Sequence, residues 1–159
     1  MNEVASDPRQ RVSENEDVTR YVGGAHFDGT TGQLNASAFD RTRKDDDGLS
    51  VNRVNVFSGD VNEDRTQLRQ VMASRMSLGR SAIFAQLNIG AALAALAEFE
   101  EDLFVGRDPL GADGTKLANP AHALFIGLPF KGEAIGSLKA EIAGDRLRAL
   151  VHDHFTAIE

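Results

Sequence analysis

Apolar residues in this chain recur at two spacings, and stretches with the two spacings follow one another along the sequence. In LSVNRVNVF, residues 49–57, β-branched residues alternate in part with polar ones, which is typical of a β-strand. In VNEDRTQLRQVMASRM, residues 61–76, Leu68, Val71 and Met72 recur at the spacing of a helix. A chain that carries both patterns is expected to bury the apolar stripe of each helix against a sheet.

The same two patterns predict the remaining elements. Strands are expected at 19–23, 81–87, 103–105 and 122–129, and a loose hairpin at 27–37, where Asp-Gly and Thr-Gly pairs mark turns. Helices are expected at 61–76, with Asp60 or Asn62 as the cap, at 89–100, and at 135–142, ending near Gly144. Residues 147–151 fit a last strand or a further helical turn. We therefore predict an α+β fold, with a mixed sheet of about five strands covered by about three helices.

The predicted domain covers residues 18–159. Residues 1–17 are polar, mixed in charge and almost without large apolar groups, so they cannot repay the entropy cost of ordering, and we predict a disordered tail. The length of 159 residues fits one domain with a core large enough to need no disulfide.

The setting that we expect is cytoplasmic. The chain has no cysteine, which excludes thiolate zinc sites and redox motifs, and its first residues do not resemble a secretory signal. The most apolar segment, residues 89–96, is far shorter than the ~20 residues that span a bilayer, so no membrane partner is expected. The net charge of −7 opposes a broad phosphate-binding surface, although a local basic patch remains open.

The charged stretch FDRTRKDDDGLSVNR, residues 39–53, is the first candidate binding segment. Arginine suits a carboxylate or phosphate because its planar fork donates two parallel hydrogen bonds. The candidate ligand-binding residues here are Phe39, Arg41, Ser50 and Arg53. The alternative is local pairing of the arginines with the aspartates at 45–47. Those three adjacent carboxylates point in different directions and do not match a calcium loop, so no metal site is predicted.

Two histidines are candidate proton carriers. His26 follows a Gly-Gly-Ala turn, and His122 begins an apolar strand, where Asp108 or Asn119 could orient its ring if the loop folds back. Asp108 and Asn119 are therefore added to the candidate ligand-binding residues. The alternative is a histidine at a strand end that bonds to a backbone carbonyl. The sequence fixes no distance between the two histidines, and it predicts no cofactor.

A basic stripe is expected on the helix at 61–76, where Arg65 and Arg69 are one helical turn apart. It could face nucleic acid or an acidic partner, and the alternative is a solvated helix face. Ser50 lacks the Gly-x-Ser-x-Gly sequence of a hydrolase elbow, so the sequence alone does not support a serine nucleophile.

Two short motifs give the chain a resemblance. The pattern A-F-x-R-x-x-x-D-x-x-G-L-S-V at 38–51, with D-P-L at 108–110 and N-P-A-H-A at 119–123, resembles a group of short uncharacterised bacterial proteins. The resemblance covers most of residues 19–143. It implies a bacterial intracellular setting and carries over no activity or catalytic residue.

Two functional hypotheses follow. The first, slightly favoured, is a small interaction or accessory module that binds a partner protein or nucleic acid through the 39–53 segment and the face of Arg65 and Arg69. The second is an enzyme, a hydrolase or transferase acting on a phosphate-containing or nucleotide substrate. In that case Arg41 or Arg53 would hold the anion, and His26 and His122 would handle protons.

Overall fold

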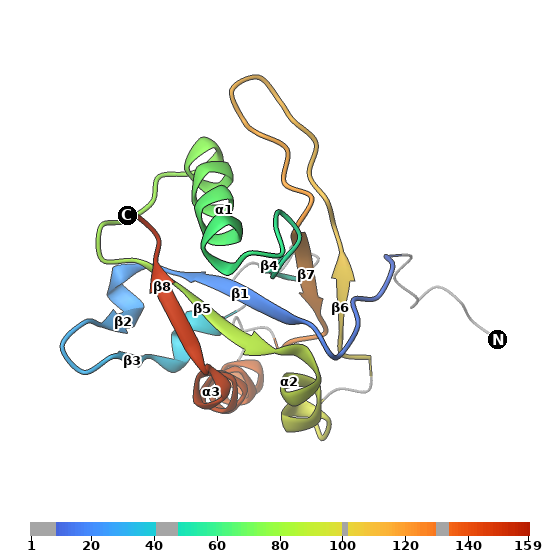
Figure 1. The fold of residues 1–159 in the computed structure, drawn as a ribbon. Helices are drawn as coiled ribbons and strands as arrows, with labels where there is room; N and C mark the ends of the chain where they lie inside the picture. The colour runs from blue at the N-terminus through green and yellow to red at the C-terminus, as the bar shows by residue number, and fades with distance from the viewer. Residues whose placement is uncertain (1–8, 41–47, 100–101, 130–133) are drawn as a thin grey trace.

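The computed structural model describes residues 9–40, 48–99, 102–129 and 134–159. It confirms the α+β class (Figure 1). The elements are, in order, β1 (Asp17–Val22), η1 (Gly24–His26), β2 (Phe27–Asp28), β3 (Gln33–Leu34), η2 (Ala36–Phe39), β4 (Leu49–Arg53), α1 (Val61–Arg75), β5 (Ile83–Asn88), α2 (Ile89–Leu96), β6 (Phe104–Arg107), β7 (His122–Ile126), α3 (Ala134–Leu150) and β8 (Asp153–Thr156). Here η marks a 3-10 helix.

One six-stranded sheet forms the centre, in the order β6-β7-β4-β1-β5-β8, and β2 and β3 make a separate hairpin. Every described pairing in the six-stranded sheet is antiparallel, so this sheet is antiparallel rather than mixed. Residues directly opposite each other on neighbouring strands therefore share a face of the sheet.

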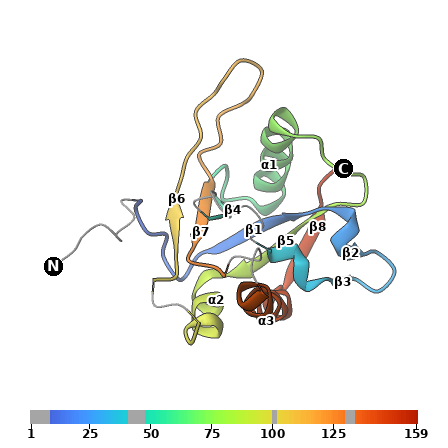
Figure 2. The ribbon, with the colours of Figure 1, turned by 180° about the vertical axis from the view of Figure 1, so that it is seen from behind.

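Helices cover both faces of the sheet. α1 lies on one side and α2 with α3 on the other, as the front and back views show (Figures 1 and 2). The larger core joins the sheet to α2 and α3 through residues such as Val18, Leu96 and Leu147. The smaller core joins Leu68 of α1 to Phe84 and other residues of the sheet. The face of the sheet that α1 covers is thus only partly apolar.

The α1 helix begins where the sequence predicts it. The Asp60 side chain accepts a hydrogen bond from the backbone N–H of Glu63 at 2.9 Å, which confirms Asp60 as the cap. Leu68 and Val71 are buried, as their spacing predicts. The helix therefore presents its apolar stripe to the sheet, and Asp64 is buried on the same helix.

Strand β4 is shorter than the sequence predicts. It ends at Arg53, and Asn55 takes a positive φ of 66°. The turn that follows is held by the Asp64 carboxylate, which accepts the backbone N–H groups of Asn55, Phe57 and Ser58 at 3.0, 3.0 and 3.3 Å. The N–H of Val54 still donates to the carbonyl of Asp17 at 3.2 Å, and the bonds to Asp64 hold the residues after it in a turn instead of a continued strand.

Helix α3 continues through Gly144, where the sequence predicts its end. A Cβ at Gly144 would lie 2.2 Å from the carbonyl oxygen of Ala36, so this glycine lets η2 approach the helix closely. Residues 147–150 are helical, and β8 then begins at Asp153.

Part of the predicted tail is packed. The N–H of Val12 donates to the carbonyl of Val105 at 2.8 Å, and Arg107 donates to the carbonyl of Gln10 at 2.8 Å. Val12 is buried in the larger core. A single apolar residue and backbone bonding thus order residues 9–12 along the outer edge of β6, although their composition predicts a tail.

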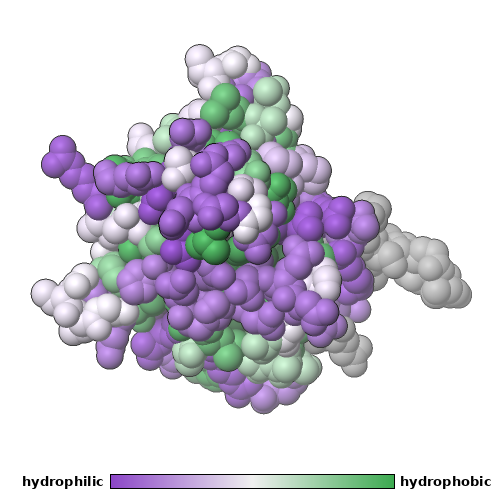
Figure 3. All heavy atoms as spheres, viewed as in Figure 1, coloured by the Kyte–Doolittle hydropathy of each residue, from purple (hydrophilic) through white to green (hydrophobic). Residues whose placement is uncertain are grey.

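The surface is mainly polar on the side that carries α1 and β8, where apolar atoms form small separate patches (Figure 3). Among the described helices, none is both long enough and apolar enough to cross a membrane.

Candidate functional site

Polar residues form one continuous row across the sheet on the side that α1 partly covers. Each member lies opposite the next one on the neighbouring strand. From the β6 edge of the sheet to β8 they are Asp108, His122, Asn52, Thr19, Gln86 and Asp153. We call these six residues the polar row. The buried polar residues of the described chain are Thr19, Asn52, Asp64 and Asn119, and each belongs to this row or to a segment beside it. Buried polar residues are the informative exceptions in a protein interior, so the polar row is the first place to look for a functional site.

Ser50, His122 and Asp108 form a hydrogen-bonded relay at one end of the polar row. The Ser50 Oγ lies 3.2 Å from His122 Nε2. On the other side of the ring, His122 Nδ1 lies 3.1 Å from Asp108 Oδ2 and 2.9 Å from the Asp108 carbonyl oxygen. Both acceptors on that side require Nδ1 to carry the proton, which leaves Nε2 free to accept a hydrogen bond from the Ser50 hydroxyl. We call these three residues the relay.

Three adjacent strands hold the relay. Ser50 lies on β4 opposite Leu124, so His122, two residues away on β7, is its diagonal neighbour. Asp108 follows β6, and its N–H donates to the carbonyl of His122 at 3.0 Å. The orientation of all three side chains is thus set by sheet pairing, which is more rigid than a loop.

The relay is shielded at the histidine and open at the serine. The His122 side chain is 12% exposed, and Ser50 lies at the surface. Arg9 lies at the Asp108 end of the relay, with its Nε 3.4 Å from Asp108 Oδ1. An accessible hydroxyl backed by a shielded imidazole is an arrangement that can support nucleophilic chemistry.

Asn119, in the segment just before β7, supports the relay through its bond to Asn52. It is fully buried; its amide nitrogen donates to Asn52 Oδ1 at 2.8 Å, and its own oxygen accepts the N–H of Ala121 at 3.1 Å. Since Asn52 is the residue opposite His122, this bond fixes the segment that enters β7. Asn119 therefore acts on the geometry of the site from inside the protein.

The other candidate residues lie elsewhere. His26 Nδ1 bonds to Ser37 Oγ at 2.7 Å, and no contact within the described part of the chain joins His26 to His122. Phe39 is buried in the larger core, away from solvent. Arg41 lies outside the described residues, as do the aspartates at 45–47.

Arg53 is paired within the chain. Its guanidinium donates to both carboxylate oxygens of Glu16, at 3.0 and 3.1 Å, so it forms a two-pronged ion pair. Its partner, Glu16, is a residue that neither the binding hypothesis nor the alternative of pairing with the aspartates at 45–47 names. The sequence gives no sign of this ion pair, because 37 residues separate the two side chains.

Arg20 is a residue that the sequence analysis did not single out. Its guanidinium donates to the carbonyl oxygens of Ala38 and Ser50, at 3.3 and 3.0 Å. Burial lowers the pKa of Arg20 to about 10. The bond to Ser50 fixes the backbone of β4 beside the relay.

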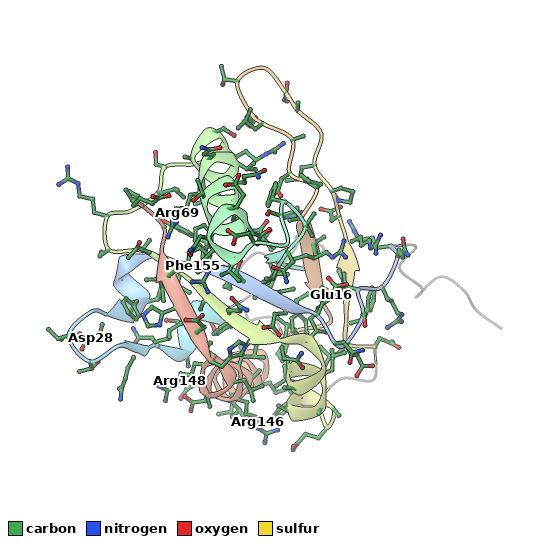
Figure 4. The ribbon with its side chains drawn as sticks, in the orientation of Figure 1. Glu16, Asp28, Arg69, Arg146, Arg148 and Phe155 are labelled. Carbon is green, nitrogen blue, oxygen red and sulfur yellow. The ribbon has the colours of Figure 1, made fainter. Side chains whose placement is uncertain are left out.

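Arg65 and Arg69 are turned toward their own chain, and Figure 4 shows Arg69 close to Phe155. Both guanidinium groups lie over the ring of Phe155, at 4.3 and 5.2 Å from its centre. Arg65 also bonds to Asp153 at 2.7 Å, and this bond holds the pKa of Asp153 below its usual value. Arg69 donates to the carbonyl of Thr156 at 2.8 Å.

Two hollows border strand β8. One, of about 180 Å³, lies over Thr19 in the polar row. The other, of about 550 Å³, lies between β3, the end of α3 and β8, and includes His152 and His154. Within the described part of the chain, no three histidine or carboxylate side chains are grouped so that they could hold a metal.

Comparisons with protein-family models, curated proteins and solved structures found no match. The fold defines an α+β protein with a six-stranded antiparallel sheet and three α-helices. Because a fold of this kind carries many functions, the function is argued from the site.

Proposed function

We propose that this protein is a hydrolase or transferase in which Ser50 is the nucleophile, His122 the general base and Asp108 the group that orients the imidazole. The observation that carries the proposal is the relay, with its contacts of 3.2 Å from Ser50 to His122 and 3.1 Å from His122 to Asp108. It retains His122 from the enzyme hypothesis and assigns the other roles to Ser50 and Asp108 instead of His26 and Arg41.

The relay suits acyl transfer from an ester, thioester or amide. Ser50 Oγ attacks the carbonyl carbon while its proton passes to His122 Nε2. The resulting imidazolium is stabilised by the Asp108 carboxylate and then gives the proton to the leaving group as the carbon–heteroatom bond breaks. Water, or a second nucleophile in a transferase, releases the acyl group and restores the serine hydroxyl.

The chain contains a second serine–histidine pair that serves as an internal control. Ser37 Oγ lies 2.7 Å from His26 Nδ1, and among the described residues no carboxylate bonds to that imidazole. Since activation of serine depends on an oriented base, Ser37 should remain unreactive where Ser50 reacts.

The test is labelling of the folded protein with a fluorophosphonate probe, followed by peptide mass spectrometry. We expect modification at Ser50, no modification at Ser37, loss of labelling in Ser50→Ala, and strong slowing in His122→Ala. Hydrolysis of p-nitrophenyl acetate should follow the same order. No labelling of the wild type, or equal labelling rates in wild type and His122→Ala, would overturn the proposal.

A projecting hairpin supports the second candidate, an interaction module. Residues 109–118 extend away from the sheet between β6 and β7 (Figure 1), and Leu117 is exposed. Arg75 of α1 holds this hairpin by donating to the carbonyls of Leu117 and Gly111, at 2.8 and 2.6 Å. A braced, exposed hairpin costs little entropy when it binds a partner protein.

The test of this candidate is a photo-crosslinking residue at position 117 in cells. One partner should be crosslinked repeatedly at 117 and lost in Arg75→Ala, which releases the hairpin. Crosslinks that persist unchanged in Arg75→Ala would contradict it. Binding of nucleic acid gains no support from Arg65 and Arg69, because both are occupied by Phe155 and by acceptors in β8.

A further inference from the structure

The hollow over Thr19, here called the Thr19 hollow, lies between α1, the turn after β4, and strands β1, β5 and β8. Its volume is about 180 Å³, below the ~300 Å³ at which pockets for drug-sized ligands begin. Its lining combines an apolar wall, to which Val54, Leu68 and Phe155 contribute, with hydrogen-bonding groups. A fragment-sized molecule or group is the occupant that such a space admits.

The hydroxyl of Thr19 has no partner in the described chain. Thr19 is 2% exposed, and its Oγ1 is buried without a hydrogen bond. The strand register puts its side chain on the same face as Asn52 and Gln86, toward the hollow. A buried hydroxyl without a partner is costly, and a molecule in the hollow that bonds to it would remove that cost.

The charged groups of the lining are already neutralised. Arg53 is paired with Glu16, and Arg65 with Asp153. The Asp64 carboxylate accepts three backbone N–H groups. A charged ligand would therefore lose hydration without gaining a free counter-charge, which favours an uncharged ligand.

Gln86 supplies a second hydrogen-bonding group next to Thr19. Its amide nitrogen donates to Asp17 at 2.8 Å, and among the described residues no donor bonds to its amide oxygen. The Thr19 hydroxyl donates and accepts, while the Gln86 oxygen only accepts. Together they match the edge of a molecule that carries an adjacent donor and acceptor, such as an amide.

We propose that the Thr19 hollow binds an uncharged, planar amide or heterocycle of about the size of a nucleobase, with its polar edge on Thr19 and Gln86 and its body against the apolar wall. This inference is independent of the relay, because Asn52 and Asn119 stand between the two places and neither Ser50 nor His122 lines the hollow.

The test uses adenine, uracil and nicotinamide as probes, each followed by ligand-observed NMR with the full chain. At least one should bind the wild type. Thr19→Ser should keep this binding, and Thr19→Val should weaken it about tenfold, the effect of losing one hydrogen bond. Because Oγ1 has no internal partner, Thr19→Val should melt no lower than the wild type.

A second variant blocks the mouth of the hollow without touching Thr19. Val61 lines the hollow and is 54% exposed, so Val61→Trp should leave the core intact and abolish binding of the same probe. The proposal is overturned if no probe binds at millimolar concentration, or if binding survives in both Thr19→Val and Val61→Trp. A lower melting temperature for Thr19→Val, or preferential binding of acetate or inorganic phosphate, would also overturn it.

Discussion

Asp108 and His122 are joined by three contacts, one between their backbones and two that His122 Nδ1 makes, with the Asp108 carbonyl oxygen and with its carboxylate. The N–H of Asp108 donates to the carbonyl of His122 at 3.0 Å, while His122 Nδ1 lies 3.1 Å from Asp108 Oδ2. The backbone bond extends the pairing of β6 with β7 by one residue, so the carboxylate is held beside the ring before any substrate binds. Such preorganisation is what a base for Ser50 requires.

Replacing the Asp108 carboxylate tests whether its contact with His122 contributes to catalysis. Asp108→Asn should slow fluorophosphonate labelling of Ser50 by at least about 100-fold, because the same change in a serine protease costs about 10⁴ in rate. The fold should persist, since the backbone bond does not depend on the side chain. Asp113→Asn, on the exposed hairpin, is the matched control. Equal labelling rates in the two variants would exclude a role for Asp108.

The stability of the turn after β4 should depend on the side chain of Asp64. Asp64→Ala leaves three backbone N–H groups without their acceptor, and we expect it to lower the free energy of unfolding by about 3 kcal/mol. Urea unfolding followed by circular dichroism measures this loss. Glu63→Ala, one residue earlier and exposed, should change it by less than about 0.5 kcal/mol. A similar small change at both positions would show that solvent replaces the carboxylate.

Gly144→Ala should destabilise the protein, although alanine usually stabilises a helix relative to glycine. Alanine in place of a mid-helix glycine normally stabilises by about 0.5–1 kcal/mol. Here a Cβ would lie 2.2 Å from the Ala36 carbonyl, so Gly144→Ala should destabilise by about 1–3 kcal/mol. The control is Gly111→Ala, where a Cβ meets nothing within 4 Å. Thermal unfolding compares the two, and a rise in melting temperature for Gly144→Ala would refute the close approach of η2.

Local signals predict most elements of this fold and fail where distant contacts decide. The spacing of Leu68 and Val71 and the cap at Asp60 predict α1, because all three act within the helix itself. The end predicted at Gly144 is wrong, because that glycine serves contact with η2 and not termination. The early end of β4 likewise depends on Asp64, which no pattern within residues 49–57 reveals.

The candidate site was only partly predictable for the same reason. The sequence marks Ser50, Asp108 and His122 as candidates, and it offers either Asp108 or Asn119 as the residue that orients His122. The contact between Ser50 and His122 joins residues 72 positions apart, and it depends on the register of β4 against β7. The hydroxyl of Thr19 carries no sequence signal, because threonine is an ordinary residue in strands.

The pair formed by Arg65 and Asp153 should make stability depend on pH. The hydrogen bond from Arg65 lowers the pKa of Asp153 and outweighs the opposite effect of burial. As pH falls, the unfolded chain takes up the proton first, so the contribution of this pair is present above the ordinary carboxyl pKa and is lost as pH falls through the folded value.

Asp153→Asn should therefore lower the free energy of unfolding at neutral pH by less than about 1 kcal/mol, since the carboxylate is largely exposed. The difference in free energy of unfolding between this variant and the wild type should shrink below about pH 4, where unfolded carboxyl groups become protonated. Urea unfolding at about pH 7, 5 and 3 measures it, and Asp113→Asn should show no such narrowing. A gap that stays constant across this range would mean that Arg65 does not hold the ionised form, and that β8 is fixed to α1 by the contacts of Phe155 instead.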